Sequence, residues 1–155
     1  MAGKGTPALV AAERARIPFT VHEYRQDPNA ASYGLEAAER LGVAAARVFK
    51  TLVANVDGEH TVAIVPVEAE LDLKALGKRA SMARPADAER ITGYVRGGIS
   101  PLGQRRRLPT VLDESALEFD TIFVSAGRRG LEIELAPADL LALTAGDVRP
   151  IAVRR

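Results

Sequence analysis

The pattern of apolar and polar positions predicts short strands separated by helices. Residues 19–24 alternate with a period of two, which is typical of a strand with one apolar face. Residues 48–56 are rich in β-branched and apolar side chains, and Asp57-Gly58 then predicts a hairpin turn into a strand at 61–67. Shorter strands are expected at 110–113, 121–125, 131–135 and 148–153.

Capping residues mark where the helices begin and end. Thr6 followed by Pro7 is typical of a helix start, and this helix is expected to run to residue 15. Ser32 can cap a second helix, which ends at Gly42. Further helices are expected at 72–79, 85–91 and 137–143.

The order of these elements favours a mixed α/β (α+β) fold. Strands and helices are interspersed without a steady strand–helix–strand rhythm, and at least two strand pairs look like hairpins. We therefore expect a single domain over residues 1–155, with a mixed, largely antiparallel sheet or partial barrel flanked by helices. Pro66, near the end of a predicted strand, indicates an edge strand or a bulge.

Composition narrows the class of protein. A chain of 155 residues with 47% apolar and 26% charged residues is ordinary for one globular domain. The absence of cysteine excludes disulfides, thiolate metal sites and a cysteine nucleophile. The sequence has neither a long apolar run nor a signal peptide, so we expect a cytoplasmic protein without a membrane partner. With a net charge of +1, any contact with nucleic acid must come from a local patch.

Residues 92–109 contain four glycines and two prolines, which rule out a long helix or a central strand. Gly97-Gly98 followed by Ser100-Pro101 indicates a shaped loop that can present backbone groups to a ligand. A solvated surface turn is the alternative, and these residues alone favour neither. A polyanion could be held beside the loop by Arg105, Arg106 and Arg107.

Lys50 is the most informative single residue, because it lies in the middle of the more apolar face of the strand at 48–56. Its aliphatic stem could reach past its neighbours so that the ammonium meets water. Alternatively, the ammonium points into a pocket, where low dielectric strengthens its pull on a carbonyl oxygen or phosphate. Burial would then also lower its pKa.

Other residues point to no known hydrolytic motif. The only imidazoles, His22 and His60, lack the surroundings of a serine hydrolase or a zinc site. Glu132 and Glu134 alternate with apolar residues, which by default predicts a solvated strand face. Ser125, next to a glycine-arginine turn, is expected to hydrogen-bond within that turn. The residues alone do not define a reaction.

Four segments, at 48–53, 92–103, 107–113 and 123–135, resemble the bacterial YbaK proteins, which are Cys-tRNA(Pro) deacylases of the wider YbaK/aminoacyl-tRNA editing family. The most specific signals are Gly-Gly-Ile-Ser-Pro-Leu-Gly at 97–103 and the Lys50-Thr51 pair. The resemblance covers essentially the whole chain.

The resemblance implies a fold like the editing domain of prolyl-tRNA synthetase and a trans-editing enzyme that clears Cys-tRNA(Pro). In this family the thiol of the substrate is thought to attack its own ester carbonyl, so neither a metal nor a cofactor is expected. The essential lysine falls on Lys50. The expected substrate-binding residues are Tyr24, Tyr33, Thr51, Gly97, Gly98, Ile99, Ser100, Pro101, Ser125 and Glu132. Tyr33 stands where phenylalanine is usual, and Glu132 where aspartate is usual.

The expected partners are charged proline tRNA, bound by Arg105, Arg106 and Arg107, and prolyl-tRNA synthetase in a ternary complex. DNA is not expected as a partner. Two alternatives stay open: an Ala-tRNA(Pro) hydrolase that uses water in place of the thiol, and a non-catalytic module that binds tRNA or the synthetase.

Overall fold

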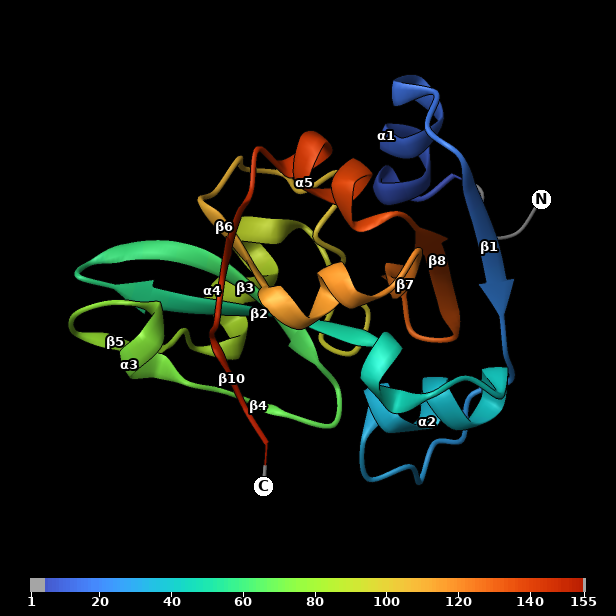
Figure 1. The fold of residues 1–155 in the computed structure, drawn as a ribbon, viewed down its shortest axis with the longest axis horizontal. Coiled ribbons are helices and arrows are strands. Elements are labelled where there is room, and N and C mark those ends of the chain that lie inside the picture. The colour runs from blue at the N-terminus through green and yellow to red at the C-terminus, as the bar shows by residue number, and fades with distance from the viewer. Residues whose placement is uncertain (1–4, 155) are drawn as a thin grey trace.

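Three β-sheets and the helices packed on them form the protein, whose structure is a computed structural model that describes residues 5–154 (Figure 1). Lys4 and the rest of the polar start of the chain therefore lie outside it. The strands are β1 (Phe19–Glu23), β2 (Phe49–Val56), β3 (Glu59–Pro66), β4 (Glu70–Leu71), β5 (Ala80–Met82), β6 (Thr110–Asp113), β7 (Ile122–Arg128), β8 (Leu131–Leu135), β9 (Asp147–Arg149) and β10 (Ala152–Val153).

The larger sheet has five strands in the order β5-β2-β3-β6-β9, and the smaller sheet has three in the order β1-β8-β7. β4 and β10 pair antiparallel as a short third sheet. β2 and β3 form the expected antiparallel hairpin, and β8 pairs antiparallel with both β1 and β7. β6 pairs parallel with β3 and β9, so the larger sheet is mixed. The predicted mixed, largely antiparallel α/β fold is confirmed. Within residues 5–154 the sheets do not close into a barrel.

Two of the five helices within residues 5–154 begin at the predicted caps, Thr6 and Ser32. The helices are α1 (Pro7–Ala15), α2 (Tyr33–Leu41), α3 (Leu73–Leu76), α4 (Pro85–Thr92) and α5 (Pro137–Thr144), with 3₁₀ turns η1 (Ala45–Arg47) and η2 (Glu114–Glu118). The side chain of Thr6 accepts a hydrogen bond from the N–H of Leu9, and Ser32 accepts one from Leu35. Within residues 5–154 no helix is long and apolar enough to cross a membrane.

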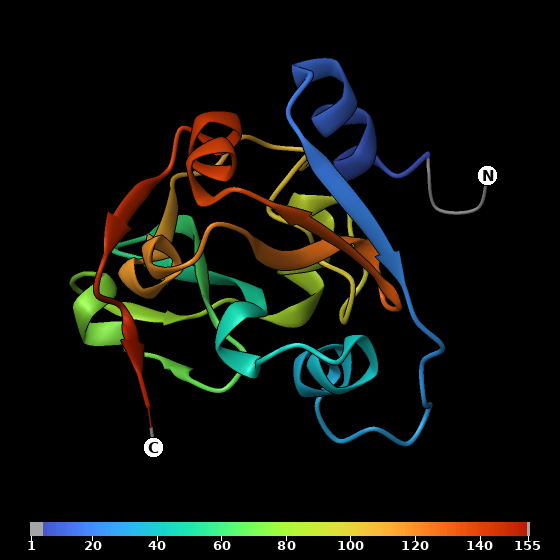
Figure 2. The same cartoon turned by 45° about the vertical axis from the view of Figure 1, so that its right-hand side comes forward.

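The larger and the smaller sheet meet where β2 begins. Val48, directly before β2, forms an isolated parallel bridge with Phe123 of β7. α2 covers this junction with Ala37 and Ala38, which pack in one buried cluster with Val48, Val67 and Phe123. In Figure 2, α2 lies below the junction, while α1 and α5 lie on the opposite side of the molecule. Residues of this junction and of the start of α2 line a common cavity.

Two local predictions were wrong. Pro66 does not mark an edge strand, because β3 lies between β2 and β6. Proline fits there because β6 pairs only with residues 62–64 of β3, so no neighbour requires an N–H from Pro66. The helix expected at 72–79 ends at Leu76, since Gly77 packs so closely on Val56 that a Cβ would lie 2.5 Å from its Cγ1. Residues 80–82, which follow this turn, pair with β2 as an edge strand that the sequence did not predict.

Candidate functional site

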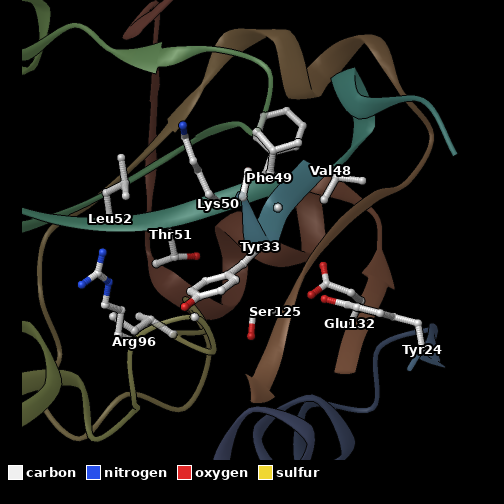
Figure 3. Close-up of a pocket in the computed structure, with 15 residues that line it drawn as sticks. Tyr24, Tyr33, Val48, Phe49, Lys50, Thr51, Leu52, Arg96, Ser125 and Glu132 are labelled. Carbon is white, nitrogen blue, oxygen red and sulfur yellow. The ribbon is translucent and has the colours of Figure 1, made fainter. Parts of the chain in front are cut away.

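A cavity of about 280 Å³ lies beside the junction of the larger and the smaller sheet (Figure 3). Strand β2, the first turn of α2, the glycine-rich loop and the smaller sheet each contribute a wall. The lining residues are Tyr24, Ser32, Tyr33, Gly34, Val48, Phe49, Lys50, Thr51, Leu52, Val67, Arg96, Gly97, Ile99, Ser125 and Glu132. Residues that lie more than 100 positions apart in the sequence therefore share one site.

Eight of the eleven residues expected to be catalytic or to bind the substrate line this cavity, and three residues of the loop do not. Gly98 packs against the turn between β7 and β8, where a Cβ would lie 2.5 Å from the Cα of Arg128. Ser100 is fully buried, and its hydroxyl accepts a hydrogen bond from the N–H of Leu102 at 3.2 Å. Pro101 lines a different cavity. Much of the glycine loop is thus shaped for close packing.

Lys50 lies half-buried in the wall formed by β2. Burial lowers the pKa of its ammonium, and the attraction of Glu70 only partly offsets this. Figure 3 shows its ammonium end on the far side of the cavity from Glu132 and Tyr24. A cation whose charged form is disfavoured by burial suits a role in which a ligand brings further negative charge beside it.

Glu132 shows that the prediction of a solvated strand face was wrong. Only 6% of this residue is exposed, and burial raises the pKa of its carboxyl to about 8. No residue of 5–154 donates a hydrogen bond to that carboxyl. Burial together with the nearby charge of Glu132 raises the pKa of Tyr24 to about 12. Figure 3 shows the two side chains reaching the same end of the cavity.

Glu134, two residues further along β8, has the opposite environment. Its carboxylate accepts hydrogen bonds from Thr121 at 2.6 Å and from Arg47 at 3.5 Å, and it contacts His22 at 2.9 Å. The hydrogen bond from Thr121 is the largest cause that lowers its pKa. Neighbouring carboxyl groups whose pKa values are pushed apart often have different roles. His22 therefore contacts Glu134 and does not line the cavity.

Thr51 carries a buried hydroxyl without a hydrogen-bond partner among residues 5–154. Burying an unpaired hydroxyl lowers stability by about 1–3 kcal/mol. Thr51→Val should therefore raise the free energy of unfolding by about 1 kcal/mol in chemical denaturation. Thr110 is a matched control, since its buried hydroxyl donates to the carbonyl of Leu108 at 3.0 Å and Thr110→Val should lower stability. A Thr51→Val protein less stable than wild type would contradict this account.

Three charged residues in or behind the walls of the cavity escaped the sequence analysis. Arg96 lines the cavity, and its only signal is its position directly before Gly97. Arg129 and Glu36 form an ion pair of 3.0 Å behind Tyr33, with side chains that are 17% and 5% exposed. Neither Arg129 nor Glu36 stands out in the sequence, because an arginine in a turn and a glutamate in a helix are usually exposed to solvent.

The three arginines expected to bind tRNA lie on the surface, away from the cavity lining. Arg105 donates to the carbonyl of Arg90 at 3.4 Å. Arg106 and Arg107 line a second cavity of about 240 Å³ together with Pro101. None of the three forms an ion pair within the described residues. Nor do the described residues include a group of three histidine, aspartate or glutamate side chains that could hold a metal ion.

Most residues that line this cavity fall in a segment that is similar to a known protein family. Residues 27–143 match the family model described as "Aminoacyl-tRNA editing domain", and every cavity-lining residue except Tyr24 falls in that range. An Enterococcus faecalis protein named "Putative Cys-tRNA(Pro)/Cys-tRNA(Cys) deacylase EbsC" is 40% identical, over 96% of this chain and 94% of that protein. The Escherichia coli K12 "Multifunctional Ser/Thr-tRNA deacylase ProXp-y" is 33% identical, over 88% of this chain and 84% of that protein.

A solved structure agrees with these sequence matches. It is described as "a putative trans-editing enzyme for prolyl tRNA synthetase", and it superposes with a TM-score of 0.83 at 25% identity over 95% of both chains.

Proposed function

Because this chain belongs to the aminoacyl-tRNA editing domain family, we propose that it is a trans-editing deacylase, which cleaves the ester between a wrongly attached amino acid and its tRNA. We propose Cys-tRNA(Pro) as the substrate, in line with the description of the E. faecalis relative. The observation that carries the proposal is a cavity with Lys50 at one end and the unpaired Glu132 at the other.

The two ends of the cavity suit the two ends of an aminoacyl ester. The α-ammonium of the amino acid would pair with the carboxylate of Glu132, whose ionisation the cavity itself disfavours. The ester and the terminal ribose would then lie towards Lys50, whose ammonium can stabilise negative charge on oxygen. Tyr33 and Ile99 would bound the space for the amino-acid side chain.

The cavity suggests that the nucleophile comes from the substrate. Among residues 5–154 no imidazole lines it, and the chain has no cysteine. The hydroxyl of Ser32 caps α2, and that of Ser125 accepts a hydrogen bond from the N–H of Gly127 at 3.2 Å. In the proposed reaction the thiol sulfur bonds to the ester carbon, the ester C–O bond breaks, and the thiol proton passes to the ribose oxygen. The products are a cyclic thiolactone and free tRNA, and the protein contributes positioning and electrostatics.

A second candidate activity is hydrolysis of a thiol-free aminoacyl-tRNA by water. The E. coli relative, described as a Ser/Thr-tRNA deacylase, favours this possibility. The deciding experiment measures release of amino acid from tRNA charged with cysteine, alanine, serine or threonine. Release of cysteine alone, with thiolactone as the first product, would support the thiol route. Release of alanine, serine or threonine would support the water route, and binding without any release would mark a non-catalytic module.

Arg106 and Arg107 are expected to contact phosphates of the tRNA. Replacing both by alanine should weaken tRNA binding and reduce the slope of log K against log salt by about 1–2, since each phosphate contact contributes about 0.7–0.9. Fluorescence anisotropy at several salt concentrations would measure this. Arg79→Ala is the control, because Arg79 is an exposed arginine near Asp57 on the β2–β3 hairpin. An unchanged slope in the double variant would remove these residues from the interface.

Prolyl-tRNA synthetase is the expected protein partner, in a ternary complex with the charged tRNA. The description of the solved structural relative supports this choice. Co-sedimentation of the protein with the synthetase, with and without proline tRNA, would test it. A complex that needs the tRNA would support the ternary arrangement.

A further inference from the structure

Tyr33 forms a wall of the cavity, and contacts from two other segments fix its ring. The guanidinium carbon of Arg129 lies 4.1 Å from the ring centroid. At an edge of the ring, Gly97 approaches so closely that a Cβ would lie 2.9 Å from both Cδ2 and Cε2. The residue is nevertheless 40% exposed, because it stands at the mouth of the cavity. The position of this wall therefore depends on the position of Arg129.

Arg129 is itself held by a buried network that sequence alone did not reveal. Its guanidinium pairs with Glu36 of α2 at 3.0 Å and donates to the carbonyl of Asp27. The N–H of Asp27 in turn donates to the carboxylate of Glu36. One arginine thus ties the turn between β7 and β8 to the segment that leads into α2. The backbone of the same turn packs against Gly98 of the glycine loop.

These contacts join two walls of the cavity through one residue. The first turn of α2 supplies Tyr33, and the glycine loop supplies Gly97 and Ile99. Both segments pack on the turn that carries Arg129. Without the guanidinium, Tyr33 would lose the group over its ring, and Glu36 would be left as a buried carboxylate without its cation. The ring of Tyr33 would then be free to move away from the cavity.

We propose that Arg129 is a positioning residue that sets the width of the amino-acid pocket and so determines which side chains the enzyme accepts. This inference rests on the proposed function, since it assumes that the cavity receives the aminoacyl group. Arg129 does not line the cavity and would touch no substrate. It acts by holding Tyr33, and a pocket with fixed walls discriminates by size better than one whose walls yield.

The test compares Arg129→Ala with Arg128→Ala. Arg128 directly precedes Arg129 at the end of β7, and its ion pair with Glu23 at 3.2 Å is exposed. Arg129→Lys is a second variant, which keeps a positive charge for Glu36 but lacks the planar guanidinium. Binding is measured with stable amide analogues of aminoacyl-adenosine that carry alanine or leucine. The readout is the ratio of the two Kd values, which a loss of overall stability does not change.

We expect Arg129→Ala to lower the preference for alanine over leucine by about five- to tenfold, because relaxed walls admit the larger side chain. Arg129→Lys should give an intermediate ratio, and Arg128→Ala should match wild type. NMR of the Tyr33 ring should shift in the Arg129 variants only. A preference within twofold of wild type in both Arg129 variants would overturn the inference.

An error in the proposed function would be visible in the wild-type protein alone, without any Arg129 variant. Wild type that binds the analogues but releases no amino acid from any charged tRNA would contradict the deacylase activity, and the ratio would still decide the role of Arg129. Wild type that binds neither analogue would overturn the role of Arg129, whereas release of amino acid from charged tRNA would still decide the proposed function.

Discussion

Replacing Lys50 by alanine is expected to lower kcat/KM for deacylation of Cys-tRNA(Pro) by about 10²–10³-fold, the usual cost of removing a group that stabilises charge in the transition state. The ammonium lies in a half-buried wall, where its interaction with a developing negative charge is stronger than in water. Single-turnover assays with saturating enzyme would measure the loss in the chemical step itself.

Stability measurements separate this loss from misfolding. Burial lowers the pKa of Lys50, so the charged form makes the folded protein less stable, and Lys50→Met should not lower the free energy of unfolding at neutral pH. The exposed Lys78 is the matched control, since Lys78→Ala should keep full activity. Turnover within threefold of wild type in Lys50→Met would contradict a catalytic role and leave Lys50 as a strand residue whose stem packs on its neighbours.

Replacing Glu132 by glutamine is expected to stabilise the protein at alkaline pH. The carboxyl titrates at about 8 in the folded protein, against a reference pKa of 4.5. Between these values the folded state holds a proton that the unfolded state releases, so wild type loses stability as the pH rises through this window. The full effect approaches about 4–5 kcal/mol above pH 8. Glutamine does not titrate, so the variant should be increasingly more stable than wild type from pH 4.5 to 8.

Glu134→Gln is the matched control on the same strand, and its sign is opposite. Hydrogen bonds from Thr121 and His22 lower the pKa of Glu134, so its ionised form stabilises the fold once the pH exceeds the unfolded value. Glu134→Gln should therefore be less stable than wild type at neutral pH. Chemical denaturation at pH 5, 7 and 8.5 would measure both variants. A Glu132→Gln variant whose advantage does not grow with pH would show that the carboxyl is not buried as described.

The expected gain from Glu132→Gln should come with a loss of function. If the carboxylate pairs with the substrate ammonium, the glutamine variant should raise KM for the charged tRNA while it stabilises the free protein. Burial disfavours the charged forms of both Lys50 and Glu132, and the two side chains lie at opposite ends of the cavity instead of pairing with each other. A ligand with complementary charges at its two ends would relieve both.

Local sequence signals determined much of the architecture. Thr6 and Ser32 identified two helix starts because capping uses only neighbouring backbone groups. Asp57-Gly58 identified the hairpin that carries Lys50, since turn type depends on a few adjacent residues. Lys50 itself stood out because a cation on the apolar face of a strand breaks the alternation. The mixed sheet followed from the order of the elements.

Only the tertiary structure decided what covers each face of those elements. Periodicity places Glu132 and Glu134 on the same face of β8, but only Glu132 is buried, because it lies in the wall of the cavity. In the same way, Arg129 acquires its buried partners from segments about 100 residues earlier in the chain. Periodicity and turn signals act over a few neighbouring residues, whereas burial, ion pairing and cavity shape arise from segments that meet only after the chain has folded.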